Sequence, residues 1–95
     1  MIQTFNSIET EKNWGGIRSA KLPFEIQDIA TSKLRRLNNS VDLKDLSIPP
    51  SSRPEKLNGQ YNDYHSIRIN DQWRIIFKWS KGQSHNVEII DYHKI

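Results

Sequence analysis

Residues 64–79, YHSIRINDQWRIIFKW, decide the fold, because they hold two runs in which apolar and polar side chains alternate. A polar cluster at residues 70–72 separates the two runs. Alternation at period two on both sides of a turn-forming cluster predicts a β-hairpin. A two-residue loop would set Ile67 against Arg74 and would mix the two faces of the hairpin. A three-residue loop keeps one apolar face, and a buried face determines register. The register that it predicts pairs Ile69 with Trp73, Ile67 with Ile75, and His65 with Phe77.

The same register places Arg68 directly across from Arg74 on the other face of the hairpin. Like charges in this position destabilise a sheet. Two interpretations remain open for this pair. The guanidinium groups either splay into water or pair with a nearby acid, or they form a site for a phosphate, which a planar guanidinium binds in bidentate fashion.

Length and composition limit what the chain can be. Residues 1–95 are expected to form a single domain that buries about 60–65% of the surface of the unfolded chain. No cysteine is present, so disulfides and thiolate metal sites are excluded. The three histidines, at positions 65, 85 and 93, do not have the spacing of a zinc site, and we expect no metal and no cofactor. The net charge of +3 permits a polyanionic partner without requiring one. No stretch is apolar enough to cross a membrane and no secretory signal opens the chain, so we expect a cytoplasmic location.

Two helices are predicted before the hairpin. Ser7 is a suitable N-cap for a short helix that ends near Trp14, before two glycines. Pro23 suits the start of a longer helix over residues 23–38. Its apolar positions recur at helical spacing and should cover the apolar face of the hairpin. They are Leu22, Ile26, Ile29, Ala30, Leu34 and Leu37.

The remaining segments complete an α+β fold, with two N-terminal helices packed on one face of a small, mostly antiparallel sheet. Residues 1–5 are β-prone and are a candidate edge strand. Residues 47–54 include three prolines and should form a loop. A short strand over residues 55–58 leads to a turn at Gly59. Residues 80–84 should form a turn before a last strand over residues 85–93.

The faces of the last strand predict how it pairs. Setting Trp79 opposite Val87, and Phe77 opposite Ile89, keeps the apolar side continuous. On the other side this register brings Tyr92 opposite Arg74. The sequence therefore predicts that polar and charged side chains converge at one end of the sheet.

These side chains have the chemistry that RNA cleavage without a metal requires. The 2′-OH must lose a proton, the phosphate needs charge stabilisation, and the leaving 5′-oxygen needs a proton. Arginines can hold the phosphate, and a histidine titrates near neutral pH. We expect Arg68 and Arg74 to hold the phosphate, His93 to titrate, Tyr92 to stack on a base or donate a proton, and Asp91 or Glu55 to act as base. His65 is expected to be packed on the core side, and His85 has no assigned role.

The chain also resembles a known family. The resemblance covers essentially the whole chain and is most specific in the hairpin 64–75 and in Asp91-Tyr92-His93, which match in order and spacing. On these residues it is similar to the HigB toxins of the RelE/ParE superfamily of type II toxin–antitoxin systems. The resemblance implies a ribosome-dependent mRNA endonuclease that cuts messages in the ribosomal A site and stops growth. It also implies a HigA-type helix-turn-helix antitoxin as partner.

Individual positions can be compared with that family. Asp91, Tyr92 and His93 match its catalytic positions, and Arg74 matches an arginine that contacts phosphate. The chain departs from the pattern at Glu55, where some members have a catalytic histidine, and at Asn58, which replaces a common lysine.

Other functions are compatible with the same residues. A ParE-type relative would poison DNA gyrase with the same fold, and a small basic sheet could bind RNA without cleaving it. For the nuclease, docking on ribosomal RNA needs a positive surface. Its expected members are Lys12, Arg18, Lys21, Lys33, Arg35, Arg36, Arg53 and Lys56, although a basic helix face is usually only solvated.

Overall fold

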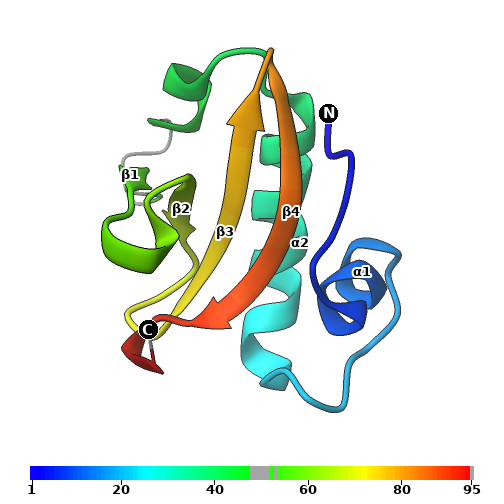
Figure 1. Ribbon diagram of the computed structural model, residues 1–95. Coiled ribbons are helices and arrows are strands. Elements are labelled where there is room, and N and C mark those ends of the chain that lie inside the picture. The colour runs from blue at the N-terminus through cyan, green and yellow to red at the C-terminus, as the bar shows by residue number, and fades with distance from the viewer. Residues whose placement is uncertain (48–51, 53, 95) are drawn as a thin grey trace.

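The computed structural model describes residues 1–47, 52 and 54–94. Two helices come first in the chain, and a four-stranded antiparallel sheet follows. Figure 1 shows the longer helix lying behind the sheet and the shorter one beside its edge. The expected α+β fold is confirmed. In the described part of the chain, no helix has the length and apolarity needed to cross a membrane.

Both predicted helices form close to their expected bounds. Helix α1 spans Ile8–Trp14, and the Ser7 hydroxyl accepts a hydrogen bond of 3.1 Å from the Thr10 amide, as an N-cap does. Helix α2 spans Phe24–Asn39 and follows Pro23, which has no side-chain role in capping it. A 3₁₀ turn at Leu43–Ser47 follows α2.

The strands of the sheet lie in the order in which they occur in the chain. They are β1 (Glu55–Lys56), β2 (Tyr64–Arg68), β3 (Trp73–Ser80) and β4 (Gln83–Asp91), in the order β1-β2-β3-β4. The central hairpin has the predicted register, since Ile67 pairs with Ile75 and Arg68 pairs with Arg74. The Trp73 carbonyl accepts the Ile69 amide at 2.9 Å, which closes the three-residue loop as expected.

The predicted register of the last strand was wrong. Ile89 pairs with Ile75 and not with Phe77, and Ile90, not Tyr92, lies opposite Arg74. The turn is also tighter than the predicted 80–84, because Lys81 and Gly82 alone connect the strands. Both residues have positive φ, 52° and 76°, as a type I′ turn requires. A shift of two residues leaves every side chain on its own face, so matching of faces could not detect the error.

A β-bulge nearer the start of β4 changes the register again. The pairing shifts between Ile76 and Lys78, and Asn86 opposite this region has a φ of 55°. The Asn86 amide donates to the Thr4 hydroxyl at 2.8 Å. The N-terminal segment runs parallel to β4 here, with bridges at Ile2 and Phe5, so it pairs as isolated bridges and not as a full edge strand.

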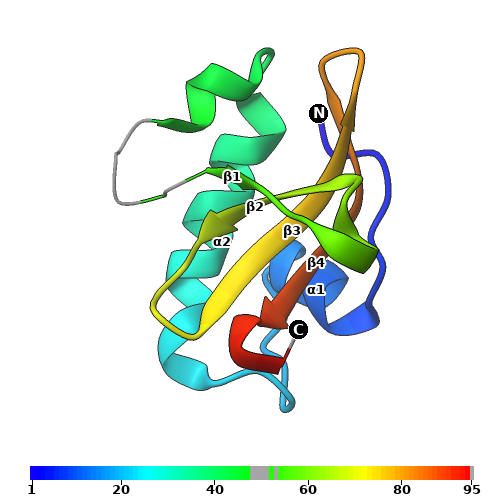
Figure 2. The same cartoon turned by 60° about the vertical axis from the view of Figure 1, so that its left-hand side comes forward.

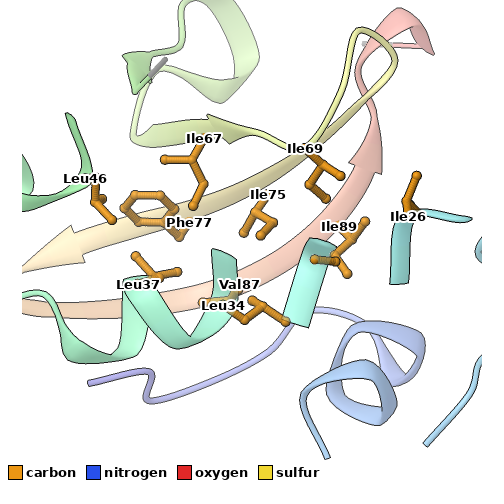
Figure 3. Close-up of a cluster of buried hydrophobic side chains, with 11 residues drawn as sticks. Ile26, Leu34, Leu37, Leu46, Ile67, Ile69, Ile75, Phe77, Val87 and Ile89 are labelled. Carbon is orange, nitrogen blue, oxygen red and sulfur yellow. The ribbon is translucent and has the colours of Figure 1, made fainter. Parts of the chain in front are cut away.

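The hydrophobic core lies between α2 and the sheet, as Figure 3 shows. Phe77 and Ile75 from β3 are fully buried there against Leu34 and Leu37 of α2. Ile29, which the helical spacing placed in this stripe, is instead 44% exposed. The buried face of α2 includes Gln27 and excludes Ile29.

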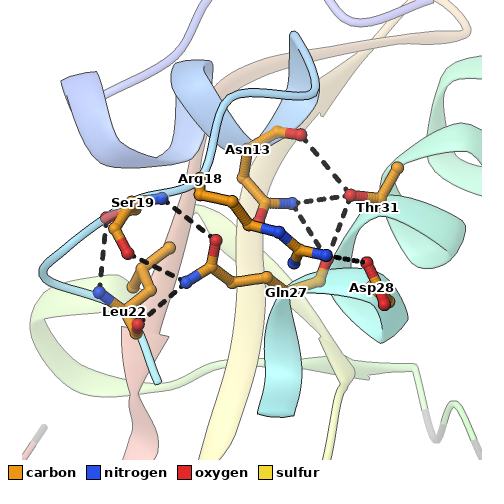
Figure 4. A network of polar contacts seen from close by, with 7 residues as sticks. All are labelled: Asn13, Arg18, Ser19, Leu22, Gln27, Asp28 and Thr31. Atoms are coloured by element: carbon orange, nitrogen blue, oxygen red, sulfur yellow. Dashed lines mark hydrogen bonds and ion pairs between the residues drawn. The ribbon is translucent and has the colours of Figure 1, made fainter. Parts of the chain in front are cut away.

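A buried polar network ties the loop after α1 to α2 (Figure 4). Gln27 accepts the Ser19 amide at 3.0 Å and donates to the Ser19 carbonyl at 3.0 Å. Asn13 donates to the Thr31 hydroxyl at 3.0 Å. Because each buried amide group finds partners, burying Asn13 and Gln27 costs little, and the connection between the helices is held in one path.

The second face of the sheet is also covered, although the sequence predicted helices on one face only. Arg74 is 8% exposed, and Ile76 and Ser66 on the same face are fully buried. The turn after β1 and the C-terminal turn lie on the side of the sheet away from α2 (Figure 2). An exposed site on a bare sheet is therefore replaced by one enclosed between turns.

We predict that Phe77→Ala destabilises the fold by about 3–5 kcal/mol, because it leaves a cavity in the core. Ile29→Ala should change the free energy of unfolding by only about 0.5 kcal/mol or less, as an exposed site on the same core-covering helix. Urea unfolding followed by tryptophan fluorescence measures both. An unchanged midpoint for Phe77→Ala would show that the core is assigned to the wrong side.

Candidate functional site

Arg74 lies at the centre of the candidate site, on the face of the sheet away from α2. Its Nη1 donates to Glu55 Oε1 at 3.0 Å and to the Ser66 hydroxyl at 3.2 Å. Register places both partners, because Glu55 pairs with Ser66 and Ser66 lies two residues from Arg68, the partner of Arg74. The Nε atom of Arg74 is buried and has no hydrogen-bond partner. The cation is thus held by one carboxylate, and its buried Nε–H donor is unused.

Tyr92 covers the Arg74 guanidinium with its ring. The guanidinium carbon lies 4.2 Å from the ring centroid, in the range of a cation–π contact. Tyr92 belongs to the 3₁₀ turn η4 (Tyr92–Lys94) and not to β4. The two side chains therefore meet as expected, but the chain brings Tyr92 back over Arg74 through a turn and not through strand pairing.

Asp91 and Gln72 anchor that turn. Gln72 Nε2 donates to Asp91 Oδ2 at 2.8 Å, and the Gln72 carbonyl accepts the Tyr92 amide at 2.6 Å. Asp91 Oδ1 accepts the His93 backbone amide at 3.1 Å. The hydrogen bond from Gln72 is the main cause that lowers the pKa of Asp91, with the His93 amide adding to it. Asp91 thus orients the backbone of the turn, whereas it was expected to act as a base.

The other predicted catalytic residues lie around this centre. Arg68 forms an ion pair with Asp71 in the hairpin loop, which matches the interpretation of a guanidinium paired with a nearby acid. His93 is exposed, one residue after Tyr92. The structure brings Arg74, Glu55 and Tyr92 into contact, and leaves Arg68 facing its own loop.

A hollow opens beside this cluster. It has a volume of about 340 Å³ and lies between β1, the turn at Gly59–Tyr61 and η4. Glu55, Asn58 and Tyr92 are on its wall, together with Lys56, Leu57, Gln60 and Tyr61. Two tyrosine rings and the Glu55 carboxylate therefore border a space that is open to solvent.

His65 is packed rather than free, as its place in the hairpin predicted. Its ring stacks on Phe77 with the centroids 5.8 Å apart. Burial lowers the pKa of His65, and the charge of Lys56 lowers it further. A ring packed on the core side is a structural group, and it lies on the face opposite to Arg74.

The residues expected to dock on ribosomal RNA are spread over the helices and β1. Arg35 and Arg36 border an open hollow on the outer side of α2. Lys33 donates to the Ser52 hydroxyl at 2.6 Å, and burial and the nearby Arg36 and Arg68 lower its pKa. Arg18 pairs with Asp28 at 3.0 Å and Lys12 pairs with Glu9 at 3.7 Å, while Lys21 and Lys56 are exposed. Arg53 lies outside the described residues.

Two contributors to the site were missed in the sequence. Ser66 holds Arg74, and its position between Tyr64 and Arg68 on the alternating strand was a usable signal for that face. Gln72 anchors the C-terminal turn, but nothing in a hairpin loop indicates a contact with a residue 19 positions away. In the described ranges, no group of three His, Asp or Glu side chains is arranged to hold a metal ion.

Comparison with known proteins decides the family. Residues 16–93 match the model of a family described as the RelE-like toxin of type II toxin–antitoxin system HigB. The chain belongs to the HigB-type toxins of the RelE superfamily. It is 38% identical over 77 residues to Toxin HigB-1 of Vibrio cholerae, covering 81% of this chain and 80% of that protein. An uncharacterized protein of Haemophilus influenzae is 31% identical over 72 residues, which are 76% of this chain and 71% of that one.

A HigB-type toxin belongs to a two-protein system, so the chain has a cognate antitoxin as partner. The matched residues 16–93 include Glu55, Arg74 and residues 91–93 at the C-terminal turn. The enclosed arginine is therefore part of the region that defines the family, while α1 precedes it.

We predict that acid releases the turn of this HigB-type toxin that carries Tyr92. The pKa of Asp91 is below its ordinary value of 3.8 when the protein is folded. A lowered pKa means that the contribution of Asp91 to stability is present above the ordinary value and is lost as the pH falls through the lower one. An NMR titration of the His93 amide should show this transition.

Asp91→Asn should remove the titration of the His93 amide, because the amide side chain has no proton to gain in this range. Glu11→Gln, an exposed change in α1, should leave it in place. A transition that persists in Asp91→Asn would show that another group controls the turn.

Proposed function

We propose that this HigB-type toxin is a ribosome-dependent mRNA endonuclease that inhibits translation and growth. The observation that carries the proposal is the enclosed Arg74, with a carboxylate at 3.0 Å, an aromatic ring at 4.2 Å and a histidine in the next turn. A fixed cation, a base and a proton donor are the groups that cleavage of RNA by its own 2′-OH requires. The partner is proposed to be a HigA-type helix-turn-helix antitoxin, and the site of action is the A site of cytoplasmic ribosomes.

The proposed reaction is a transesterification. A carboxylate takes the proton of the ribose 2′-OH, and the oxygen attacks the neighbouring phosphorus. The bond from phosphorus to the 5′-oxygen breaks, and His93 gives that oxygen a proton. The products are a 2′,3′-cyclic phosphate and a free 5′-OH, and Arg74 stabilises the added charge on the phosphate oxygens.

Glu55 is better placed than Asp91 to be the base. Both oxygens of Asp91 already accept hydrogen bonds, which lowers its pKa and its basicity. Glu55 borders the open hollow and has a half-exposed side chain. Tyr92, which borders the same hollow, is proposed to stack on a base next to the cut.

Arg68 is the second arginine of the hairpin. Arg68 lies opposite Arg74 and its own partner, Asp71, is on an exposed loop. Exchange of Asp71 for a phosphate would leave Arg68 as a second cation on the same hairpin. Arg68 is therefore proposed to hold an adjacent phosphate of the message.

We predict that Arg74→Ala lowers the single-turnover rate of mRNA cleavage about 10²–10³-fold, the usual scale for removing one electrostatic stabiliser. Because Arg74 is buried and bonded to Glu55 and Ser66, stability must be measured beside the rate. Arg74→Lys keeps the positive charge and disturbs the buried site less than Arg74→Ala does. It should still cleave slowly, because lysine lacks the planar guanidinium that binds phosphate with two donors. Cleavage at the wild-type rate in both would exclude the proposed phosphate contact.

His93→Gln should lower the same rate about 10²–10⁴-fold, as loss of a general acid does. Lys94→Gln is the matched control, since it changes the next residue of the same exposed turn and should cleave normally. Programmed ribosomes are the substrate, with DNA supercoiling assayed in parallel. Normal cleavage by His93→Gln would remove His93 from the mechanism, and altered supercoiling without cleavage would indicate a gyrase poison.

Docking on the ribosome should depend on charge and salt. Contacts between cations and phosphates release counterions, so ribosome affinity should fall steeply as salt rises. The double variant Arg35→Gln/Arg36→Gln should bind more weakly and show a shallower salt slope, measured by sedimentation with 70S ribosomes. Lys44→Gln, an exposed change outside the proposed surface, should match the wild type. A flat salt response would contradict this docking mode.

A further inference from the structure

Arg74 is already paired with a carboxylate of its own chain in the free protein. Glu55 Oε1 occupies Nη1 at 3.0 Å, while the buried Nε has no partner. A guanidinium presents several donors in one plane and binds an oxyanion with two of them at once. The Glu55 carboxylate therefore takes up part of the position that a bidentate phosphate would use, and the buried Nε–H stays unused.

We propose that Glu55 is a built-in competitor for the phosphate at Arg74, which a substrate phosphate displaces when it binds. The inference rests on the proposed function, because it assigns the ligand of that same site. In this chain Glu55 blocks the site until the substrate arrives.

The two partners of the ion pair differ in how easily they can move. The Glu55 side chain is 47% exposed, whereas the Arg74 side chain is only 10% exposed. Glu55 lies on β1, a strand of two residues that pairs with β2 alone. The carboxylate can swing into the neighbouring hollow and into water, while Arg74 stays fixed between Ser66 and Tyr92.

The arrangement has a physical cause in the burial of Arg74. A buried guanidinium without a counter-charge is costly, and leaving one partner of such a pair alone is strongly unfavourable. Glu55 supplies that charge when no RNA is bound, and a phosphate supplies it during the reaction. Free phosphate and loose RNA must compete with an acid that is already in place, so they bind weakly. A message held by other contacts on the ribosome can displace it.

The displaced carboxylate would then lie beside the bound phosphate, in the hollow that Glu55 already borders. That is where a base for the ribose 2′-OH is needed. One side chain thus excludes unwanted anions at rest and is released for proton transfer by the ligand that replaces it. Anion binding and cleavage should therefore respond in opposite directions when Glu55 is neutralised.

The test titrates inorganic phosphate into the free protein and follows the Arg74 Nε–H resonance by NMR. Glu55→Gln and Glu55→Ala should bind phosphate about fivefold to tenfold more tightly than the wild type, since breaking an ion pair of this exposure no longer opposes binding. The alanine variant covers the case in which the glutamine amide oxygen still accepts from Arg74. A phosphate-dependent rise in melting temperature gives a second readout.

Two controls separate this effect from a general change of charge. Asp63→Asn removes one exposed carboxylate elsewhere and changes the net charge by the same amount, so phosphate affinity should stay at the wild-type value. Glu55→Ala/Arg74→Gln has no Arg74 Nε–H to observe, so it is followed by the phosphate-dependent melting temperature, and it should lose the gain in affinity. A gain shared by Asp63→Asn, one that survives loss of Arg74, or unchanged affinity in both single variants would overturn the proposal. Since binding is measured without RNA, tighter binding with no nuclease activity would sustain the competitor and reject the nuclease.

Discussion

Burial of a single cation is the constraint on which the site depends. Arg74 is 8% exposed on a face of the sheet where its neighbours Ile76 and Ser66 are fully buried. A charge in that position needs partners, and the fold supplies them from three separate segments: β1, β2 and the turn after β4. The contact with Arg74 helps to fix the position of each segment, in addition to the segment's own preference for a strand or a turn. The polar centre thus organises one side of the sheet while the apolar core organises the other.

Much of the fold followed from local patterns in the sequence. The hairpin 64–79 has one register that separates apolar from polar faces, and that register is the observed one. The caps of α1 and the start of α2 follow from Ser7 and Pro23. What the sequence could not settle is any shift of two residues in β4, because such a shift preserves faces. The tight turn at Lys81-Gly82 and the bulge at Asn86 determine the register. Each requires a positive φ at a residue that is not glycine, Lys81 in the turn and Asn86 in the bulge.

The sequence predicted that Tyr92 would lie beside Arg74, but not the geometry by which the two meet. Arg74, Glu55 and Tyr92 do meet, but a turn and not strand pairing brings Tyr92 to the arginine. Face matching assumes that one side of the sheet is open, and it could not show that later turns would cover it. Asp91 acquired a structural role because its oxygens are used by backbone and by Gln72. Contacts made by turns, outside helices and strands, produce no periodic pattern of apolar and polar residues in the sequence.

Strand β4 connects features that lie far apart in the chain. Its outer edge receives the N-terminal segment and the Thr10 hydroxyl, which accepts the Ile89 amide at 2.9 Å, and its end leads into the turn that covers Arg74. Local opening of β4 would free all of these at once. A partly unfolded chain could then keep its central hairpin while presenting neither a covered arginine nor a closed sheet edge. Activity should accordingly report on the intact fold alone, and fragments left by proteolysis of this toxin should be inert.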